Sequence, residues 1–204
     1  MNSPVDLGLD ISTTYIGYCF IERNTGKVIL WGAIDIAEEG GKELSLVRKA
    51  DIALKLLQKL FQKVGGKPDK TYVEASATAY GSATTAQVLA MLAKINAMVC
   101  AGLWFCCGIE ATPVNVTSAR SKIGFKRTKE MKSKEVKEKV AEFVETTYGL
   151  VPKKRPLTSG KNKGNLVYAD GALDAIDAFV IVKGGTILCS TQSPTPKRRN
   201  SQSK

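Results

Sequence analysis

The stretch VDLGLDISTTYIGYCF, at Val5–Phe20, decides how the rest of the chain is arranged. Apolar and small residues lead into Asp10, a Ser/Thr cluster follows, and a second apolar run begins at Tyr15. This pattern predicts two strands joined by a tight polar turn. A carboxylate at the end of a buried strand is held on a rigid edge, where it can meet side chains from distant parts of the chain. Asp10 is therefore the first candidate functional residue.

The remaining sequence predicts strands and helices that alternate around this hairpin. Strands are expected at 27–36, 71–75 and 110–116, and helices at 42–64, 82–107, 133–148 and 168–185. Three meandering strands followed by alternating elements are typical of a mixed sheet with helices on both faces. The fold class is α/β. The expected organisation is one domain at 1–188, which contains a basic Gly/Pro-rich loop at 149–165, and a disordered basic tail at 189–204.

Composition excludes several kinds of chemistry. The 204 residues include no histidine, which rules out a Ser-His-Asp triad, a Cys-His dyad and a histidine general base. The five cysteines show no Cys-x-x-Cys spacing and lie mostly in apolar segments, so they are interpreted as core thiols of a reducing compartment. The N-terminus lacks the features of a signal peptide. We expect an intracellular protein, in the cytoplasm of a bacterium or a virus-infected cell, with a nucleus or organelle left open.

Positive charge is concentrated in one segment. The net charge of the chain is +11, and residues 120–163 contain 14 Lys and Arg against 5 Glu. This clustering predicts a polyanionic partner, most simply nucleic acid. The Pro-Lys-Arg-Arg sequence of the tail fits a nuclear or organellar address or a further DNA contact.

Acidic residues gather at a few apolar elements of this basic chain. Glu74 lies within the strand TYVEA, and the last predicted helix carries Asp170 as its expected N-cap, with Asp174 and Asp177 on the same face. The helix residues taken alone are equally consistent with a cap and two solvated aspartates. An unpaired charge inside an apolar strand is costly, however, so the presence of Asp10 and Glu74 in such strands favours a functional role for the acidic residues. Asp10, Glu74, Asp174 and Asp177 form a hard oxygen ligand set for two Mg²⁺ or Mn²⁺ ions.

The predicted helix at 82–107 carries a stripe of alanines and is apolar on its other faces. Lys94 and Asn96 interrupt it, and the uninterrupted run is shorter than the ~20 residues that span a bilayer, so no membrane is expected. A helix that is apolar all round is predicted to be buried on both sides, by the sheet and by a second subunit. The expected assembly is a homodimer through this helix.

These motifs together resemble the RuvC family of Holliday-junction resolvases, within the RNase H-like (retroviral-integrase-like) superfamily. The pattern LGLD-x-S-x-x-x-x-GY at Leu7–Tyr18 is similar to the family's first strand, and YVEA and the Asp174–Ile181 run match its second and third motifs. The resemblance covers roughly 7–183 and implies a five-stranded RNase H-like sheet and a homodimer. The implied activity is a Mg²⁺-dependent endodeoxyribonuclease that cuts two opposed strands of a four-way junction.

The resemblance also suggests roles for residues outside the acidic motifs. By that match Lys132 corresponds to a family lysine near the active site, which implies a catalytic role, and Arg120 corresponds approximately to another. The two are expected to stabilise the charge of the transition state or to hold the adjacent phosphate of the DNA. Tyr80 lies where the family places an aromatic wedge, although an ordinary core or hairpin tyrosine fits equally well. The Pro-Gly that the family has after its first aspartate is missing here, and the loop at 149–165 has no obvious counterpart. Phosphate contacts are predicted for Lys126, Arg127, Lys129, Lys153, Lys154 and Arg155.

Four other functions compete with junction resolution. A ribonuclease H and a flap or other branched-DNA nuclease use the same carboxylates. A non-catalytic nucleic-acid-binding protein accounts for the basic segment but leaves the carboxylates without a purpose. The Asp-Ile-Ser-Thr-Thr sequence at Asp10–Thr14 also resembles the phosphate loop of actin-like sugar kinases, but the chain is too short for their two domains.

Overall fold

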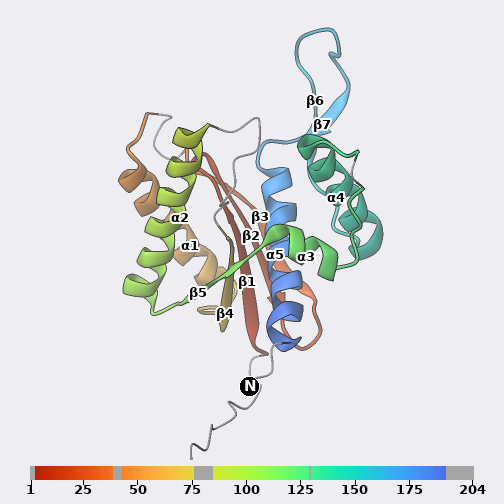
Figure 1. The fold of residues 1–204 in the computed structure, drawn as a ribbon. Coiled ribbons are helices and arrows are strands. Elements are labelled where there is room, and N and C mark those ends of the chain that lie inside the picture. Colours follow the sequence, from red (N-terminus) through yellow and green to blue (C-terminus); the bar gives the residue numbers. More distant parts are fainter. Residues whose placement is uncertain (1–2, 39–42, 76–84, 129, 192–204) are drawn as a thin grey trace, which may run out of the picture.

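Five strands form one mixed sheet in the computed structural model, which describes residues 3–38, 43–75, 85–128 and 130–191 (Figure 1). The spatial order is β3-β2-β1-β4-β5, with β1 antiparallel to β2 and parallel to β4. The strands are β1 (Val5–Ile11), β2 (Tyr15–Glu22), β3 (Val28–Asp35), β4 (Lys70–Glu74) and β5 (Ala111–Val114). The predicted fold class and the central place of the first hairpin are confirmed.

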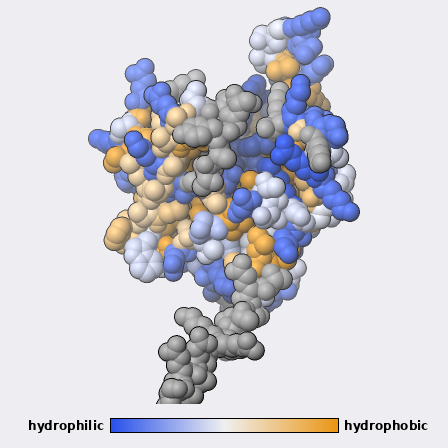
Figure 2. Space-filling model, viewed as in Figure 1, coloured by the Kyte–Doolittle hydropathy of each residue, from blue (hydrophilic) through white to orange (hydrophobic). Residues whose placement is uncertain are grey.

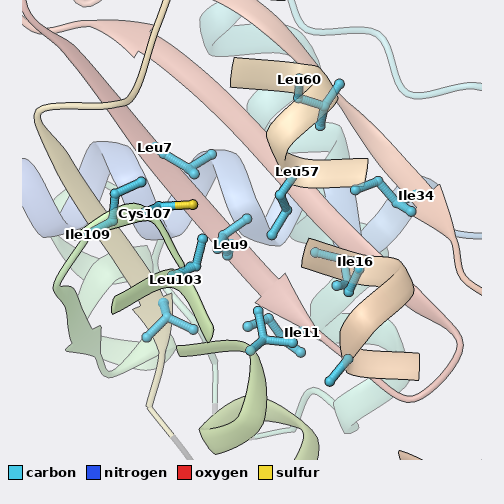
Figure 3. Packing of buried hydrophobic residues seen from close by; sticks show 14 of the residues in the cluster. Leu7, Leu9, Ile11, Ile16, Ile34, Leu57, Leu60, Leu103, Cys107 and Ile109 are labelled. Atoms are coloured by element: carbon cyan, nitrogen blue, oxygen red, sulfur yellow. The ribbon is translucent and has the colours of Figure 1, made fainter. Parts of the chain in front are cut away.

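One face of the sheet is covered by α1 (Leu46–Lys63) and α2 (Ala86–Cys107). Because successive residues of a strand point to opposite faces, Leu7, Leu9 and Ile11 of β1 all enter this core. They pack with Leu57 of α1 and with residues of α2, as Figure 3 shows for Leu103 and Cys107.

The other face is covered by α5 (Ala172–Thr191), with α3 (Val116–Lys122) and α4 (Ser133–Tyr148) packed beside it. Glycines let α5 lie directly on the sheet: a Cβ on Gly8 would be 2.2 Å from the carbonyl oxygen of Ala178, and one on Gly17 would be 2.0 Å from that of Asp174. This close approach places the start of α5 against β1 and β2, on the face that Asp10 occupies.

α2 differs from its prediction because only one side of it is buried. Ile95, Val99, Leu103 and Cys107 are buried, whereas the side chains opposite them are exposed. By length and composition α2 is the one helix of the described residues that could cross a membrane, and 17% of its most apolar stretch is buried. Interruption by two polar residues therefore does not exclude a membrane span. The packing of α2 on α1 and the sheet is that of a helix of the α/β fold.

The structure differs from the sequence predictions in three further places. The segment after β5 contains the short helix α3, which was not predicted. The basic loop contains a two-stranded hairpin of β6 (Lys154–Pro156) and β7 (Leu166–Tyr168). The last helix begins at Ala172 and continues to Thr191, so Asp170 is not its N-cap: Gly171, with φ of +74°, occupies the turn before the helix.

Candidate active site

Two of the predicted carboxylates lie at the ends of adjacent parallel strands. Leu9 of β1 is paired with Val73 of β4, so Asp10 and Glu74 are the next residues along each strand. The side chains of Leu9 and Val73 enter the α1–α2 core, and alternation directs Asp10 and Glu74 to the opposite face, toward α5. Asp10 is 5% exposed. The carboxyl ends of parallel strands meet at one edge of a sheet, which explains why two distant residues come together.

The other two carboxylates come from the start of α5. Asp174 and Asp177 are three residues apart and therefore lie on one side of the helix. A cavity of about 200 Å³ is lined by Asp10, Glu74 and Asp174 together with Lys137 of α4. Asp177 is 3% exposed and lies close enough to Asp10 to affect its ionisation. The structure therefore brings all four predicted carboxylates to one end of the sheet.

Two cations neutralise part of this negative charge. Lys137 Nζ lies 3.2 Å from Asp177 Oδ2 and 3.5 Å from Asp174 Oδ1. Arg120 Nη2, from α3, donates a hydrogen bond of 2.7 Å to the other oxygen of Asp177. α3 and α4 thus contribute one cation each to a centre that β1, β4 and α5 supply with carboxylates.

The pKa values of the site reflect burial and crowding of like charges. Burial raises the pKa of Asp10 well above its usual range, and the negative charges of Glu74 and Asp177 raise it further. Burial likewise raises the pKa of Asp174, against the opposing effect of Lys137. Burial lowers the pKa of Lys137, but attraction to Asp177, Asp10 and Asp174 outweighs it, so that this pKa is raised overall. The cluster carries an excess of negative charge that favours a bound cation.

The donor set fits a hard divalent cation in its chemistry, because all four side chains offer carboxylate oxygens. The spacing does not yet form a metal centre: within the described ranges no group of three or more acidic, cysteine or histidine side chains is placed to hold a metal ion. The ion pairs of Arg120 and Lys137 give a physical reason, because they engage oxygens of Asp174 and Asp177. A divalent cation bound here would compete with these ion pairs.

A second, basic cavity adjoins the acidic cluster. It has a volume of about 380 Å³ and is lined by Arg120, Lys126 and Arg127 with the hydroxyl residues Thr117 and Ser121. The Nε of Arg120 is buried and has no hydrogen-bond partner among the described residues. Because Arg120 lines this cavity and also donates a hydrogen bond to Asp177, it links the cluster of carboxylates to a site with the composition of a phosphate-binding pocket.

Three other predicted DNA-binding residues, Lys153, Lys154 and Arg155, lie apart from the carboxylates. Lys153 lines the cavity of about 610 Å³ between β3 and the start of α5, which contains none of the four carboxylates. Lys154 and Arg155 belong to β6. Lys129 and Tyr80 lie outside the described residues, so their predicted roles stay predictions.

The sequence did not point to Lys137, which forms ion pairs with Asp174 and Asp177. Lys132, for which the sequence predicted a catalytic role, is the N-cap residue of α4 with an exposed side chain, and its proposed role stays a prediction. Lys137 lies one residue after the buried Val136 and three before the buried Val140. Its position on the flank of the inward face of α4 was therefore readable from the helical period.

Asp170 is separate from the cluster. Its side chain is exposed and forms an ion pair of 3.1 Å with Arg155 of β6. Its position outside α5 removes the expected alignment with Asp174 and Asp177.

Comparison with known proteins identifies the fold. No family model matches the chain, and no curated protein matches it by sequence. The structure of T. thermophilus RuvC in complex with a Holliday junction substrate is similar, with a TM-score of 0.61 and 12% identity over 93% of this chain and 96% of that one. A second structure of Thermus thermophilus RuvC gives a TM-score of 0.54 and 14% identity, over 92% and 96% of the two chains.

A eukaryotic structure is similar as well. The yeast mitochondrial Holliday junction resolvase Ydc2 gives a TM-score of 0.52 and 18% identity, over 91% of this chain and 80% of that one. At these identities the likeness shows the fold, which is the RNase H-like fold of the RuvC structures. The resemblance seen in the sequence motifs is confirmed at this level.

Proposed function

We propose that this protein is a metal-dependent DNA endonuclease that resolves four-way junctions by paired, symmetric phosphodiester hydrolysis. The observation that carries the proposal is the convergence of Asp10, Glu74, Asp174 and Asp177 from three elements of an RNase H-like fold, next to a basic cavity. The similar structures belong to proteins described as Holliday junction resolvases or bound to such a junction. The basic segment that precedes α5 in the sequence supports DNA as the partner.

The roles of the residues follow from their positions. Asp10, Glu74, Asp174 and Asp177 would hold two Mg²⁺ ions, or Mn²⁺, which would supply an activated water and offset the charge of the scissile phosphate. Arg120, at the wall between the carboxylates and the basic cavity, orients the phosphate that adjoins the scissile bond. Lys137 lines the acidic cavity, holds Asp174 and Asp177 through its two ion pairs, and stabilises negative charge that develops there.

The proposal is tested by cleavage of four DNA substrates under one set of conditions. We expect a synthetic four-way junction to be cut in the presence of Mg²⁺, and a linear duplex, a flap and an RNA–DNA hybrid to be cut far more slowly. Preferred cleavage of the hybrid would instead assign a ribonuclease H activity, and preferred cleavage of the flap a flap nuclease. Tight binding to the junction with no cleavage in Mg²⁺ or Mn²⁺ would contradict the enzymatic proposal and leave a binding protein.

A homodimer through α2 is part of the proposal, because paired cuts need two active sites related by two-fold symmetry. The exposed side of α2 is mostly apolar, with Lys94 as its charged residue: its alanines are followed by Trp104 and Phe105, which are 54% and 82% exposed. Figure 2 shows hydrophobic surface gathered over this helix. Small side chains allow two helices to pack closely, and the aromatic side chains supply the apolar area that an interface core requires. The alanines on this side are Ala86, Ala90, Ala93, Ala97 and Ala101.

The substitution Ala97→Glu places a charge in the middle of this surface. We expect the wild-type protein to sediment as a dimer and the variant as a monomer, because an unpaired carboxylate in an apolar interface is costly. Sedimentation velocity measures the difference. Thr147→Glu, which adds the same charge at an exposed position on α4, is the control and is expected to remain dimeric. A wild-type monomer at micromolar concentration, or a dimeric Ala97→Glu variant, would contradict the interface.

A further inference from the structure

The β6–β7 hairpin projects from the body of the molecule beside α4 (Figure 1). Its three residue pairs, from Lys154–Tyr168 to Pro156–Leu166, are followed by a nine-residue connection at 157–165. Backbone hydrogen bonds order this connection as well, from the Leu157 amide to the Asn165 carbonyl and from the Gly164 amide to the Leu157 carbonyl. The hairpin is therefore an ordered element, although it contributes almost nothing to either hydrophobic core.

The charge of the hairpin is entirely positive. Residues 146–169 contain five Lys and Arg and no acidic residue, and nearly every side chain from 153 to 166 is exposed. Figure 2 shows this arm as hydrophilic over most of its surface. An exposed, polar, all-cationic arm fits a polyanion and does not fit an apolar protein surface.

The cations at the base and at the tip of the hairpin differ in their surroundings. At the base, Arg155 is paired with Asp170, and Lys154 Nζ lies 3.6 Å from Glu145 Oε2 and 5.3 Å from the centre of the Tyr168 ring. These contacts attach the hairpin to α4 and to the segment just before α5. At the tip, Lys161 and Lys163 are exposed, and their side chains have no ion pair or hydrogen bond with any described residue. Their full charge is available to a partner.

We propose that the β6–β7 hairpin docks in the major groove of a duplex arm of the DNA substrate. Lys154 and Arg155 anchor its base, and Lys161 and Lys163 contact phosphates. A major groove about 12 Å wide admits a two-stranded ribbon whose strands are about 4.8 Å apart, whereas the minor groove, about 6 Å wide, does not admit the two strands with their side chains. The inference rests on the proposed function in taking branched DNA as the substrate.

The position of the hairpin relative to the candidate active site supports this partner. Only five residues lie between Tyr168, the last residue of β7, and Asp174, the first carboxylate of α5. The Arg155–Asp170 ion pair fixes the hairpin directly before that helix. A DNA arm that leaves the active site along α4 therefore meets the hairpin, and contact with the hairpin restrains the direction of that arm. The selectivity for branched DNA is expected to depend on this restraint.

The double variant Lys161→Ala/Lys163→Ala tests the proposal through binding alone. Each lost phosphate contact reduces the slope of log K against log salt by about 0.9, so we expect the slope for the four-way junction to decrease by about 2. Fluorescence anisotropy over a series of salt concentrations measures it. Lys59→Ala/Lys63→Ala removes two exposed lysines from α1, on the other side of the sheet, and is the matched control with an expected unchanged slope.

A second variant tests whether the hairpin occupies the major groove. Replacing residues 157–165 by Asn-Gly keeps the three residue pairs and closes them with a two-residue turn. On wild-type complexes we expect protection from dimethyl sulfate at guanine N7, which faces the major groove, in one arm of the junction. We expect the shortened variant to lose that protection while adenine N3, in the minor groove, stays unchanged.

The outcomes separate this inference from the proposed function. If the wild-type protein neither binds nor cleaves junctions, the proposed function fails. If it cleaves them while the double variant keeps the wild-type salt slope, or while the shortened hairpin keeps the guanine N7 protection, the hairpin inference is overturned and the proposed function stands.

Discussion

Replacing Asp10 by Asn is expected to lower the rate of junction cleavage by at least about 10²–10³-fold, the loss typical of removing one group that stabilises charge in a transition state. Asn has nearly the same shape but lacks the negative charge that a divalent cation requires. Asp10 is 5% exposed and lines the acidic cavity with Glu74 and Asp174, so the substitution removes a charge from the centre of the carboxylate cluster. Single-turnover cleavage with excess protein measures the effect separately from DNA binding.

The same substitution is expected to preserve or increase stability. Burial and the charges of Glu74 and Asp177 raise the pKa of Asp10 in the folded protein, so its ionised form opposes folding at neutral pH. A neutral Asn removes that opposition. Urea denaturation at pH 7 measures the free energy of unfolding. Asp51→Asn, at an exposed position on α1, is the control and is expected to change neither quantity appreciably. Cleavage by Asp10→Asn at more than a tenth of the wild-type rate would contradict the assigned role.

Replacing Gly17 by Ala is expected to lower the free energy of unfolding by about 1–3 kcal/mol, the range for inserting a methyl group into a well-packed interior. The added Cβ would lie 2.0 Å from the carbonyl oxygen of Asp174 and 2.2 Å from its carbonyl carbon. Since these are backbone atoms of α5, the helix itself must shift. The shift displaces Asp174 and Asp177 relative to Asp10, so we expect cleavage to decrease as well. Urea denaturation and single-turnover cleavage measure the two effects.

Gly102→Ala is the matched control for this variant. Its added Cβ would be 2.2 Å from Cδ1 of Leu54, near the end of a side chain that can rotate away. Gly102 lies within α2, where alanine is the better helix former. We therefore expect a smaller loss of stability and unchanged cleavage. Equal effects of the two variants on stability and on cleavage would show that the contact between β2 and α5 does not position the carboxylates.

The four carboxylates were predictable from the sequence because local rules place each of them. Asp10 and Glu74 each stand at the end of an apolar run, and parallel strands bring such ends to one edge. Asp174 and Asp177 share a helix face by their spacing. The conclusion that these elements meet depended on the resemblance to a known family, and the structure confirms the fold that it implied.

Features set by tertiary contacts were not predictable in the same way. α3 has seven residues, too few to show a helical period, and its one fully buried residue, Ala119, packs beside α5. The position of Arg120 between Asp177 and the basic cavity was therefore visible only in the structure. Asp170 was predicted as a cap because aspartate favours that position, but Gly171 at positive φ separates it from the helix. The apolar surface of α2 indicated burial on both sides, whereas the single chain covers only one.

The hairpin shows a further limit of composition. A segment rich in Gly, Pro, Ser and Lys has few apolar side chains with which to build a core, and it was predicted as a loop without structure. Three residue pairs between β6 and β7 and two ion pairs at the base are enough to order it. The same lysines and arginines that predicted DNA binding thus divide into anchors and free cations, a distinction that the sequence does not contain.

The most direct test of the account is strand-resolved cleavage of a four-way junction, each of whose four strands is labelled in a separate preparation. In Mg²⁺ the account predicts one nick in each of two opposed strands at symmetry-related positions, and no nick when the metal is removed by EDTA. Nicks in a single strand, nicks at unrelated positions, or cleavage that persists in EDTA would contradict it.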